Sequence, residues 1–279
     1  MIEPLGPVLF AAVHKGPYLS IQPLEAELSP ENTLYLVDGI SKSERANEGL
    51  PFLEPIGLLD QWGSVEDFLE ANNVRAVVRS SSEDVMETNV EDWASAAAKT
   101  VGTPVFVVED FPGNFQPNER HRLDALFVED PSLCQLHQSR GVDPNVIFST
   151  GNPRYSQLAQ MDRASSRRRT RSQLGLSDET VLLWAGQPDG NNSYFALQRL
   201  LSHFARPGVT IMFRAHPRDE LYASGGYNKI LEESPMPVID TTRDPYAFQL
   251  YCAADLVATQ FSSAGVEASH LGVPAMFAL

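Results

Sequence analysis

Short apolar runs alternate with helix-like segments from one end of the chain to the other. The runs are almost continuously hydrophobic, as expected for parallel strands that helices cover on both faces. Eleven strands are predicted, at 7–13, 33–38, 74–79, 103–109, 124–129, 145–150, 179–186, 208–215, 236–240, 255–260 and 274–279. Helices are predicted at 64–72, 90–101, 131–140, 191–206, 243–253 and 262–271. The sequence therefore predicts an α/β protein built on parallel sheets.

A polar, arginine-rich stretch over 151–178 interrupts this alternation. A chain of 279 residues is long enough for two domains with separate cores. We therefore predict two Rossmann-like domains, 1–157 and 158–279, whose strands end at a shared cleft. Within the polar stretch, SRRRTR at 166–171 could bind a phosphorylated acceptor, although such a run more commonly forms a solvated helix or linker face.

The composition excludes several classes of protein. Acidic residues outnumber basic ones by 36 to 21, giving a net charge of −15, so binding to nucleic acid or to an anionic membrane is not expected. The cysteines, Cys134 and Cys252, are too few and too far apart for a disulfide framework or a zinc site. The apolar run from Val8 to Val13 is too short for a signal peptide or a membrane span. We expect a cytoplasmic protein without metal.

Two loops that follow predicted strands carry residues suited to anions. After 255–260 come Ser262, Ser263 and Gly265, small residues at the start of a helix, where backbone amides and the helix dipole favour phosphate. Glu267, one turn later, could contact ribose hydroxyls. An ordinary serine cap with a solvated glutamate is the structural alternative for this loop.

The second loop, RAHPR, follows the strand at 208–215. It places Arg214 and Arg218 on either side of His216, and Pro217 restricts the turn between them. Arginine forks and an imidazolium are suited to an anionic leaving group, so we predict that these three side chains bind the nucleotide. A single histidine also commonly has a structural role.

Four segments resemble the GT-B glycosyltransferase superfamily and the related UDP-N-acetylglucosamine 2-epimerases. They are TGNPRYSQL at 150–158, the His216–Pro217 pair, the Ser262–Ser263 pair with Glu267, and EASHLGVP at 267–274. The HP and SS pairs are similar to those of bacterial capsule, sialic acid and polyol-phosphate transferases. The resemblance covers about 100–279. It implies a GT-B fold that binds a nucleotide-activated donor of UDP or CMP/CDP type in the C-terminal domain, without a cofactor.

The catalytic positions of the epimerases are only partly present. Glu109 matches one of their acids, and Glu119 retains one acid of a pair in which Asn118 replaces the other. Ser80–Ser81 stands in place of a further acid, and Gln187 stands where the epimerases carry a catalytic histidine. Because glutamine cannot exchange a proton, the epimerase reaction is disfavoured.

The predicted acid or base residues are His14, Glu109 and Asp110. His14 follows the first strand, where some inverting GT-B transferases carry a similar histidine, and its ordinary pKa of about 6.5 suits deprotonation of an acceptor hydroxyl. Glu109 and Asp110 end a strand, in a segment similar to the acidic motif of some capsule transferases. For His14, an ordinary surface position is the alternative.

We therefore predict a GT-B glycosyltransferase that moves a sugar or related group from a nucleotide donor to a hydroxyl of a carbohydrate or lipid-linked acceptor. Surface polysaccharide synthesis is the expected setting. An epimerase-like isomerase and a non-catalytic nucleotide-sugar-binding protein are the alternatives. Because GT-B proteins usually continue beyond a strand such as 274–279, we also expect the chain to be a fragment.

Overall fold

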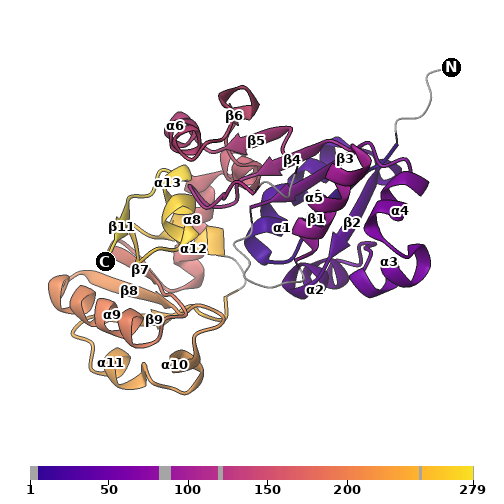
Figure 1. Cartoon of the computed structure of the whole chain (residues 1–279). Coiled ribbons are helices and arrows are strands. Elements are labelled where there is room, and N and C mark those ends of the chain that lie inside the picture. The colour runs from indigo at the N-terminus through magenta and orange to yellow at the C-terminus, as the bar shows by residue number, and fades with distance from the viewer. Residues whose placement is uncertain (1–5, 82–88, 119–121, 245–246, 279) are drawn as a thin grey trace. The chain divides into compact units, whose positions relative to one another are not determined.

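The computed structural model describes residues 6–81, 89–118, 122–244 and 247–278 (Figure 1). The chain forms two compact units, Met1–Ser156 and Gln157–Leu279. Each unit contains one parallel sheet, so the predicted α/β class is confirmed. These are unit 1 and unit 2, in chain order.

Unit 1 contains a six-stranded sheet in the order β2-β1-β3-β4-β5-β6. Its strands are β1 (Val8–Ala12), β2 (Thr33–Val37), β3 (Ala76–Ser80), β4 (Val105–Val108), β5 (Ala125–Val128) and β6 (Ile147–Ser149). All neighbouring strands are parallel, so their carboxyl ends share one edge. The chain changes direction across the sheet between β1 and β3, and in such sheets ligands bind outside the strand ends at this switch point.

Helices cover the two faces of this sheet unequally. They are α1 (Lys15–Ile21), α2 (Gly39–Asn47), α3 (Pro55–Trp62), α4 (Val65–Ala71), α5 (Val90–Val101) and α6 (Pro131–Ser139), with short 3₁₀ turns at Gln22–Glu27, Pro30–Asn32, Pro144–Val146 and Pro153–Tyr155. The larger cluster of buried side chains joins alternate strand residues to α3, α4, α5 and α6. The smaller cluster, on the other face, includes Tyr18 and Ile21 of α1. This packing fixes the loops that leave the strand ends.

Unit 2 contains a five-stranded sheet in the order β11-β10-β7-β8-β9. Its strands are β7 (Thr180–Ala185), β8 (Val209–Arg214), β9 (Val238–Asp240), β10 (Leu256–Thr259) and β11 (Ala275–Phe277). Its helices are α8 (Arg163–Gln173), α9 (Asn191–His203), α10 (Glu220–Ala223), α11 (Asn228–Glu232), α12 (Ala247–Ala253) and α13 (Ser263–His270), and α7 (Ser156–Ala159) joins the units in sequence. The switch point of this sheet lies between β7 and β10.

The arginine-rich run lies on α8, which packs against α12 within unit 2. Arg167 donates to three successive carbonyls at the end of α12 and, through Nη2, to Asp255 at 2.6 Å. Arg171 binds the other oxygen of Asp255 at 2.8 Å. These arginines satisfy carbonyls that have no partner inside their own helix. The structure therefore gives Arg167 and Arg171 a stabilising role and leaves only Arg168 and Arg169 of this run exposed.

All eleven predicted strands are present, with ends that differ from the predicted ones by at most two residues. The six predicted helices are also present, although the predicted 243–253 helix includes Pro245 and Tyr246, which lie outside the described residues. The helices that were not predicted are α1, α2, α3, α7, α8, α10 and α11. α2 and α8 are dominated by polar residues, and the others are each shorter than nine residues, so none gives a strong helical period.

Candidate active site

Three polar residues of unit 1 follow adjacent strands at the carboxyl edge of its sheet. His14 comes two residues after β1, Ser81 directly follows β3, and Asp110 comes two residues after β4. Because β1 and β3 flank the switch point, these residues surround the position where a ligand of such a sheet is expected.

Asp110 is held by its neighbours through one carboxylate oxygen. Its Oδ1 accepts from Asn114 Nδ2 at 2.6 Å and from the Ser81 hydroxyl at 3.0 Å, while the Asp110 amide donates to Ser81 Oγ. Burial raises the pKa of Asp110, although the bonds from Asn114 and Ser81 and the charge of Arg154 oppose the rise. The result is an oriented carboxyl group whose affinity for protons is increased.

The second oxygen of Asp110 lies close to the first turn of α1. A Cβ added at Gly16 would lie 3.0 Å from Asp110 Oδ2, so the absence of a side chain at Gly16 allows this approach. The loop after β1 and the loop after β4 are therefore in close contact. This contact brings Asp110 near the segment that begins with His14.

His14 begins α1 as its N-cap residue but makes no capping bond with its side chain. Its carbonyl accepts from the Tyr18 amide and from the Ser41 hydroxyl, which fixes the backbone of the turn. The preceding amide, of Val13, donates to the fully buried Glu91 at 3.3 Å. The half-buried imidazole is thus carried by a rigid turn.

Glu109 is the predicted site residue that the structure separates from the others. Its side chain is buried, and its Oε1 accepts from the Phe115 amide at 3.0 Å and lies 2.8 Å from His137 Nε2. Consecutive residues of an extended segment face opposite sides, so Glu109 faces the core of unit 1 while Asp110 faces the loop after β1. Through the bond from the Phe115 amide, Glu109 fixes the loop after β4 from the core side. Asn152 Nδ2 donates to the backbone carbonyl of Glu109 at 3.0 Å.

In unit 2, His216 is fixed in one orientation after β8. Its Nδ1 accepts from the Arg218 amide at 3.1 Å, so the neutral imidazole carries its proton on Nε2. Burial lowers the pKa of His216, and the charge of Arg218 lowers it further. Near neutral pH this histidine is therefore a neutral donor through Nε2–H, and it gains its charge only under more acidic conditions.

The two arginines that flank His216 differ in what they contact. The guanidinium of Arg214 donates to the carbonyls of Thr241 and Asp244 at 2.9 and 2.7 Å, so it holds the loop after β9. Arg218 is exposed. The structure thus assigns Arg214 a contact with backbone and leaves Arg218 as the cation beside His216.

The loop after β10 forms the N-terminus of α13. Ser262 is its N-cap and accepts from the Ala264 amide at 3.2 Å, and Ser263 donates to the buried Glu267 at 3.1 Å. Gly265 is buried, and an added Cβ would lie 2.6 Å from the ring of Phe277. Gly265 therefore permits close packing of α13 on β11, whereas the two half-buried serines lie at the helix end that favours anions.

Gln187 lies at the end of β7 and is buried. Its amide Nε2 donates to Thr259 Oγ1 at 3.4 Å, and its backbone amide donates to Ser193 Oγ. This side chain links the ends of β7 and β10 across the switch point. Glu119, the acid retained from the epimerase pattern, lies outside the described residues.

Sequence reasoning did not single out Ser81, Asn114 or Glu91 as site residues. Ser81 and Asn114 belong to the loops that follow β3 and β4, and the available signal was the pairing of a small polar residue with an acid on the next strand. Glu91 gave no such signal, because an acid in the first turn of a helix is ordinarily solvated.

No metal-binding group of three or more His, Cys, Asp or Glu side chains occurs among the described residues. Within the same part of the chain, no helix combines the length and the apolar character needed to cross a membrane.

The family of the chain follows from a match over residues 75–278 to the model of CDP-glycerol:poly(glycerophosphate) glycerophosphotransferases. The chain belongs to this family. The matched span includes the loops after β3 and β4 of unit 1 and the loops after β8 and β10 of unit 2, whereas His14 lies outside it. No curated protein matches the chain significantly.

Solved structures support the GT-B fold of this glycerophosphotransferase family member. It is similar to the UDP-GlcNAc 2-epimerase of Neisseria meningitidis bound to UDP-GlcNAc, with 14% identity, a TM-score of 0.65, and coverage of 97% of this chain and 82% of that one. The chain is also similar to the Methanocaldococcus jannaschii epimerase in complex with UDP-GlcNAc and UDP, with 18% identity and a TM-score of 0.64. This match covers 96% of this chain and 83% of that one. A third similar structure is Anabaena HepE in complex with UDP and glucose, with 15% identity, a TM-score of 0.62, and coverage of 98% of this chain and 80% of that one. The predicted GT-B fold and family resemblance are confirmed.

Proposed function

We propose that this protein transfers glycerophosphate from CDP-glycerol to a hydroxyl group of a poly(glycerophosphate) acceptor. The observation that carries the proposal is the family match over 75–278, which includes the anion-favouring loops of unit 2. The family supplies a more specific donor than the sequence motifs did, because those motifs left UDP and CMP/CDP types open. CDP-glycerol is a nucleotide-activated donor of the second type.

In the proposed reaction, the acceptor oxygen attacks the phosphorus atom that carries glycerol. A new P–O bond forms to the acceptor, and the P–O bond to the bridging oxygen of CMP breaks. The acceptor hydroxyl loses its proton to a base, and the departing CMP keeps the bridging oxygen with its electron pair. The protein therefore needs a base at the acceptor and positive potential at the departing phosphate.

Unit 2 is assigned the departing phosphate. His216 can donate through Nε2–H, the exposed Arg218 supplies a charge, and the N-terminus of α13 presents Ser262 and Ser263. Neutral His216 can bind the phosphate by hydrogen bonding without adding charge, since its pKa is lowered. The prediction that Glu267 contacts ribose is kept, with the hydrogen bond from Ser263 orienting its carboxylate.

Unit 1 is assigned the acceptor and the base. His14 is the favoured base, because its imidazole is half-buried on a rigid turn at the switch point. Asp110 is the acid of the neighbouring loop, and its Oδ2 lies against Gly16 in the first turn of α1. Glu109 is assigned a positioning role because its side chain faces the core. Gln187, bonded to Thr259, is assigned no proton transfer.

The test is an incubation with CDP-glycerol labelled in its glycerol, with and without a short poly(glycerophosphate) acceptor. We expect release of CMP that depends on the acceptor, together with one incorporated label per CMP. UDP-GlcNAc serves as the comparison donor, and we expect neither transfer nor 2-epimerisation. Label that remains in CDP-glycerol under all conditions, or solvent deuterium that enters C2 of UDP-GlcNAc, would contradict the proposal.

A further inference from the structure

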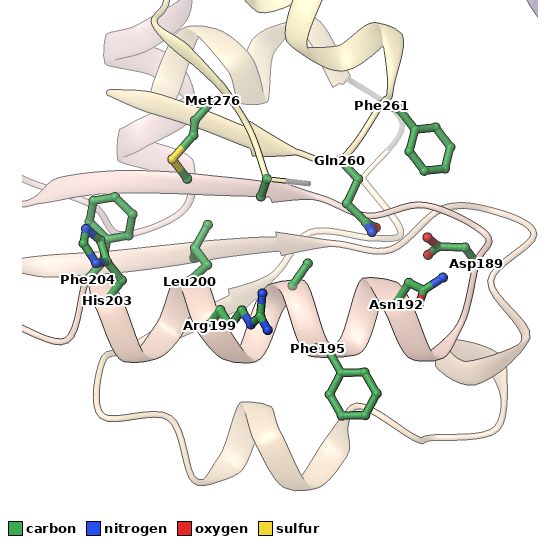
Figure 2. A pocket seen from close by; sticks show the side chains of 12 residues that line it. Asp189, Asn192, Phe195, Arg199, Leu200, His203, Phe204, Gln260, Phe261 and Met276 are labelled. Atoms are coloured by element: carbon green, nitrogen blue, oxygen red, sulfur yellow. The ribbon is translucent and has the colours of Figure 1, made fainter.

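A cavity of about 880 Å³ runs along α9 in unit 2 (Figure 2). One end is polar and contains Asp189, Asn192 and Gln260. The other end contains Phe204 and Met276 with other side chains of α9 and β11. The polar end lies at the switch point between β7 and β10, beside the loop assigned to the departing phosphate.

Gln260 occupies an unusual position at this polar end. It directly follows β10 and is only 8% exposed, yet its Oε1 has no hydrogen-bond partner. Figure 2 shows its side chain directed toward the start of α9, where Asp189 and Asn192 lie. A buried acceptor without a donor costs free energy unless a ligand or water satisfies it. The cavity leaves room for a ligand with an O–H or N–H group.

The surrounding charge limits the chemistry of that group. The Asp189 carboxylate, which accepts from the Ser193 amide, lines the same end of the cavity, whereas Arg199 lines the cavity farther along α9 (Figure 2). A phosphate placed beside it would be repelled, whereas a neutral hydroxyl can donate to Gln260 without this penalty. The polar end is therefore suited to a hydroxyl-bearing group that carries no charge.

The position of Gln260 in the chain selects which part of the donor it contacts. Only Phe261 separates Gln260 from Ser262, so a group bound by Gln260 lies next to the phosphates. In CDP-glycerol the glycerol and the ribose are each attached directly to a phosphate, so both groups lie next to the diphosphate, and the assignment of ribose decides between them. Ribose is assigned to Glu267, which is one turn into α13.

We propose that Gln260 accepts a hydrogen bond from a hydroxyl of the donor's glycerol group and so distinguishes CDP-glycerol from CDP. This inference rests on the proposed function, because it takes CDP-glycerol as the donor. It names a specificity-determining residue and places the glycerol in the polar end of the cavity along α9.

The test compares the affinities of CDP-glycerol and CDP by calorimetric titration of the full chain. Gln260→Met keeps the length of the side chain but removes the amide, and we expect it to reduce the ratio of CDP-glycerol affinity to CDP affinity by about five- to tenfold. Gln198→Met is the matched control, because Gln198 lies on α9 but is exposed. The control should leave the ratio unchanged.

A second variant keeps the test informative if Gln260→Met does not fold. Gln260→Glu retains an acceptor oxygen, so both nucleotides should bind more weakly through charge while their affinity ratio stays near that of the unmodified protein. An unchanged ratio in Gln260→Met, or a ratio lost equally in Gln260→Glu, would overturn the assignment of Gln260. Failure of the unmodified protein to bind either nucleotide would instead overturn the proposed function, and this inference with it.

Discussion

The loops at the strand ends of the two units differ in how their polar groups are used. In unit 1, hydrogen bonds from Ser81 and Asn114 fix the orientation of Asp110, and burial raises its pKa against the effect of these bonds. In unit 2, His216 is oriented by a backbone amide, while Arg218 beside it is exposed. An oriented, desolvated acid suits proton transfer, whereas an accessible cation suits a charged ligand.

The difference shows that similar sheets acquire different chemistry from the groups at their edges. Both sheets are parallel, and both present loops beside a switch point. A helix begins at this edge in each unit, but the polar side chains of unit 1 mainly bond one another, whereas the N-terminus of α13 in unit 2 carries two half-buried serines. The assignment of base to unit 1 and donor to unit 2 follows from this contrast.

The largest expected effect tests the role of unit 1. We expect His14→Ala to lower the transfer rate by about 10²- to 10⁴-fold, the range typical for loss of a general base, while CDP-glycerol affinity stays unchanged. Steady-state rates and calorimetric titration measure the two quantities. His270→Ala is the control, because His270 is exposed at the end of α13. Equal losses of transfer rate and of CDP-glycerol affinity in His14→Ala would show that His14 binds the donor. This result would contradict the assignment of the base to unit 1 and the donor to unit 2.

The second prediction concerns the arginine run of α8, which stabilises unit 2. Arg171→Met removes bonds to the carbonyls of Ala253, Ser177 and Glu179 and to Asp255. We expect a loss of about 2 kcal/mol in the free energy of unfolding, reduced from a fully buried pair because Asp255 is partly exposed. The exposed Arg169→Met should change it by less than about 0.5 kcal/mol. Urea denaturation measures both.

The ion pair between Arg171 and Asp255 also predicts how the free energy of unfolding depends on pH. Burial alone would raise the pKa of Asp255, but bonds from the Val181 amide and Arg167 outweigh it and lower the pKa, with the charge of Arg171 contributing. A lowered pKa in the folded state adds stability above the unfolded value of about 3.9, and this stability is lost as the pH falls through the folded value. The difference in the free energy of unfolding between Arg171→Met and the unmodified protein should therefore become smaller below about pH 4. A constant difference down to acid pH would show that the charge of Asp255 contributes little.

The smallest expected effect concerns the support of Asp110. Asn114→Ala removes a bond that lowers the pKa of Asp110, so this pKa should rise further. If ionised Asp110 assists the base, the acidic limb of the pH–rate profile moves to higher pH, and the rate at neutral pH falls a few-fold, as for loss of about 1 kcal/mol. The exposed Asn191→Ala is the control. An acidic limb that stays at the same pH in Asn114→Ala would show that ionisation of Asp110 does not affect the rate.

The sequence predicted the strands more completely than the site. Parallel strands buried on both faces form continuous apolar runs, as in β7 and β8, and the three-residue edge strand β9 was located as well. The polar helix α8 was missed because its stabilising contacts are with Asp255 and the end of α12, which are more than 80 residues away. Its arginines offered a ligand-binding interpretation that only tertiary contacts could replace.

For the site, sequence position identified the edges but not the directions of side chains. Glu109 and Asp110 were indistinguishable as neighbouring acids, although Glu109 faces His137 and Asp110 faces the loop after β1. In the same way, Arg214 and Arg218 flank His216 symmetrically in sequence, yet the side chain of Arg214 holds the loop after β9. Such differences depend on which side of the strand end each residue occupies.

The most direct test of the central claim is hydrogen exchange of the full chain with and without saturating CDP-glycerol. The account predicts that the donor slows exchange in the loops 214–218 and 260–267 of unit 2, and leaves 109–114 of unit 1 near its unbound rate until an acceptor is added. Protection confined to 14–18 and 109–114, with 214–218 and 260–267 unchanged, would contradict the assignment of the donor to unit 2.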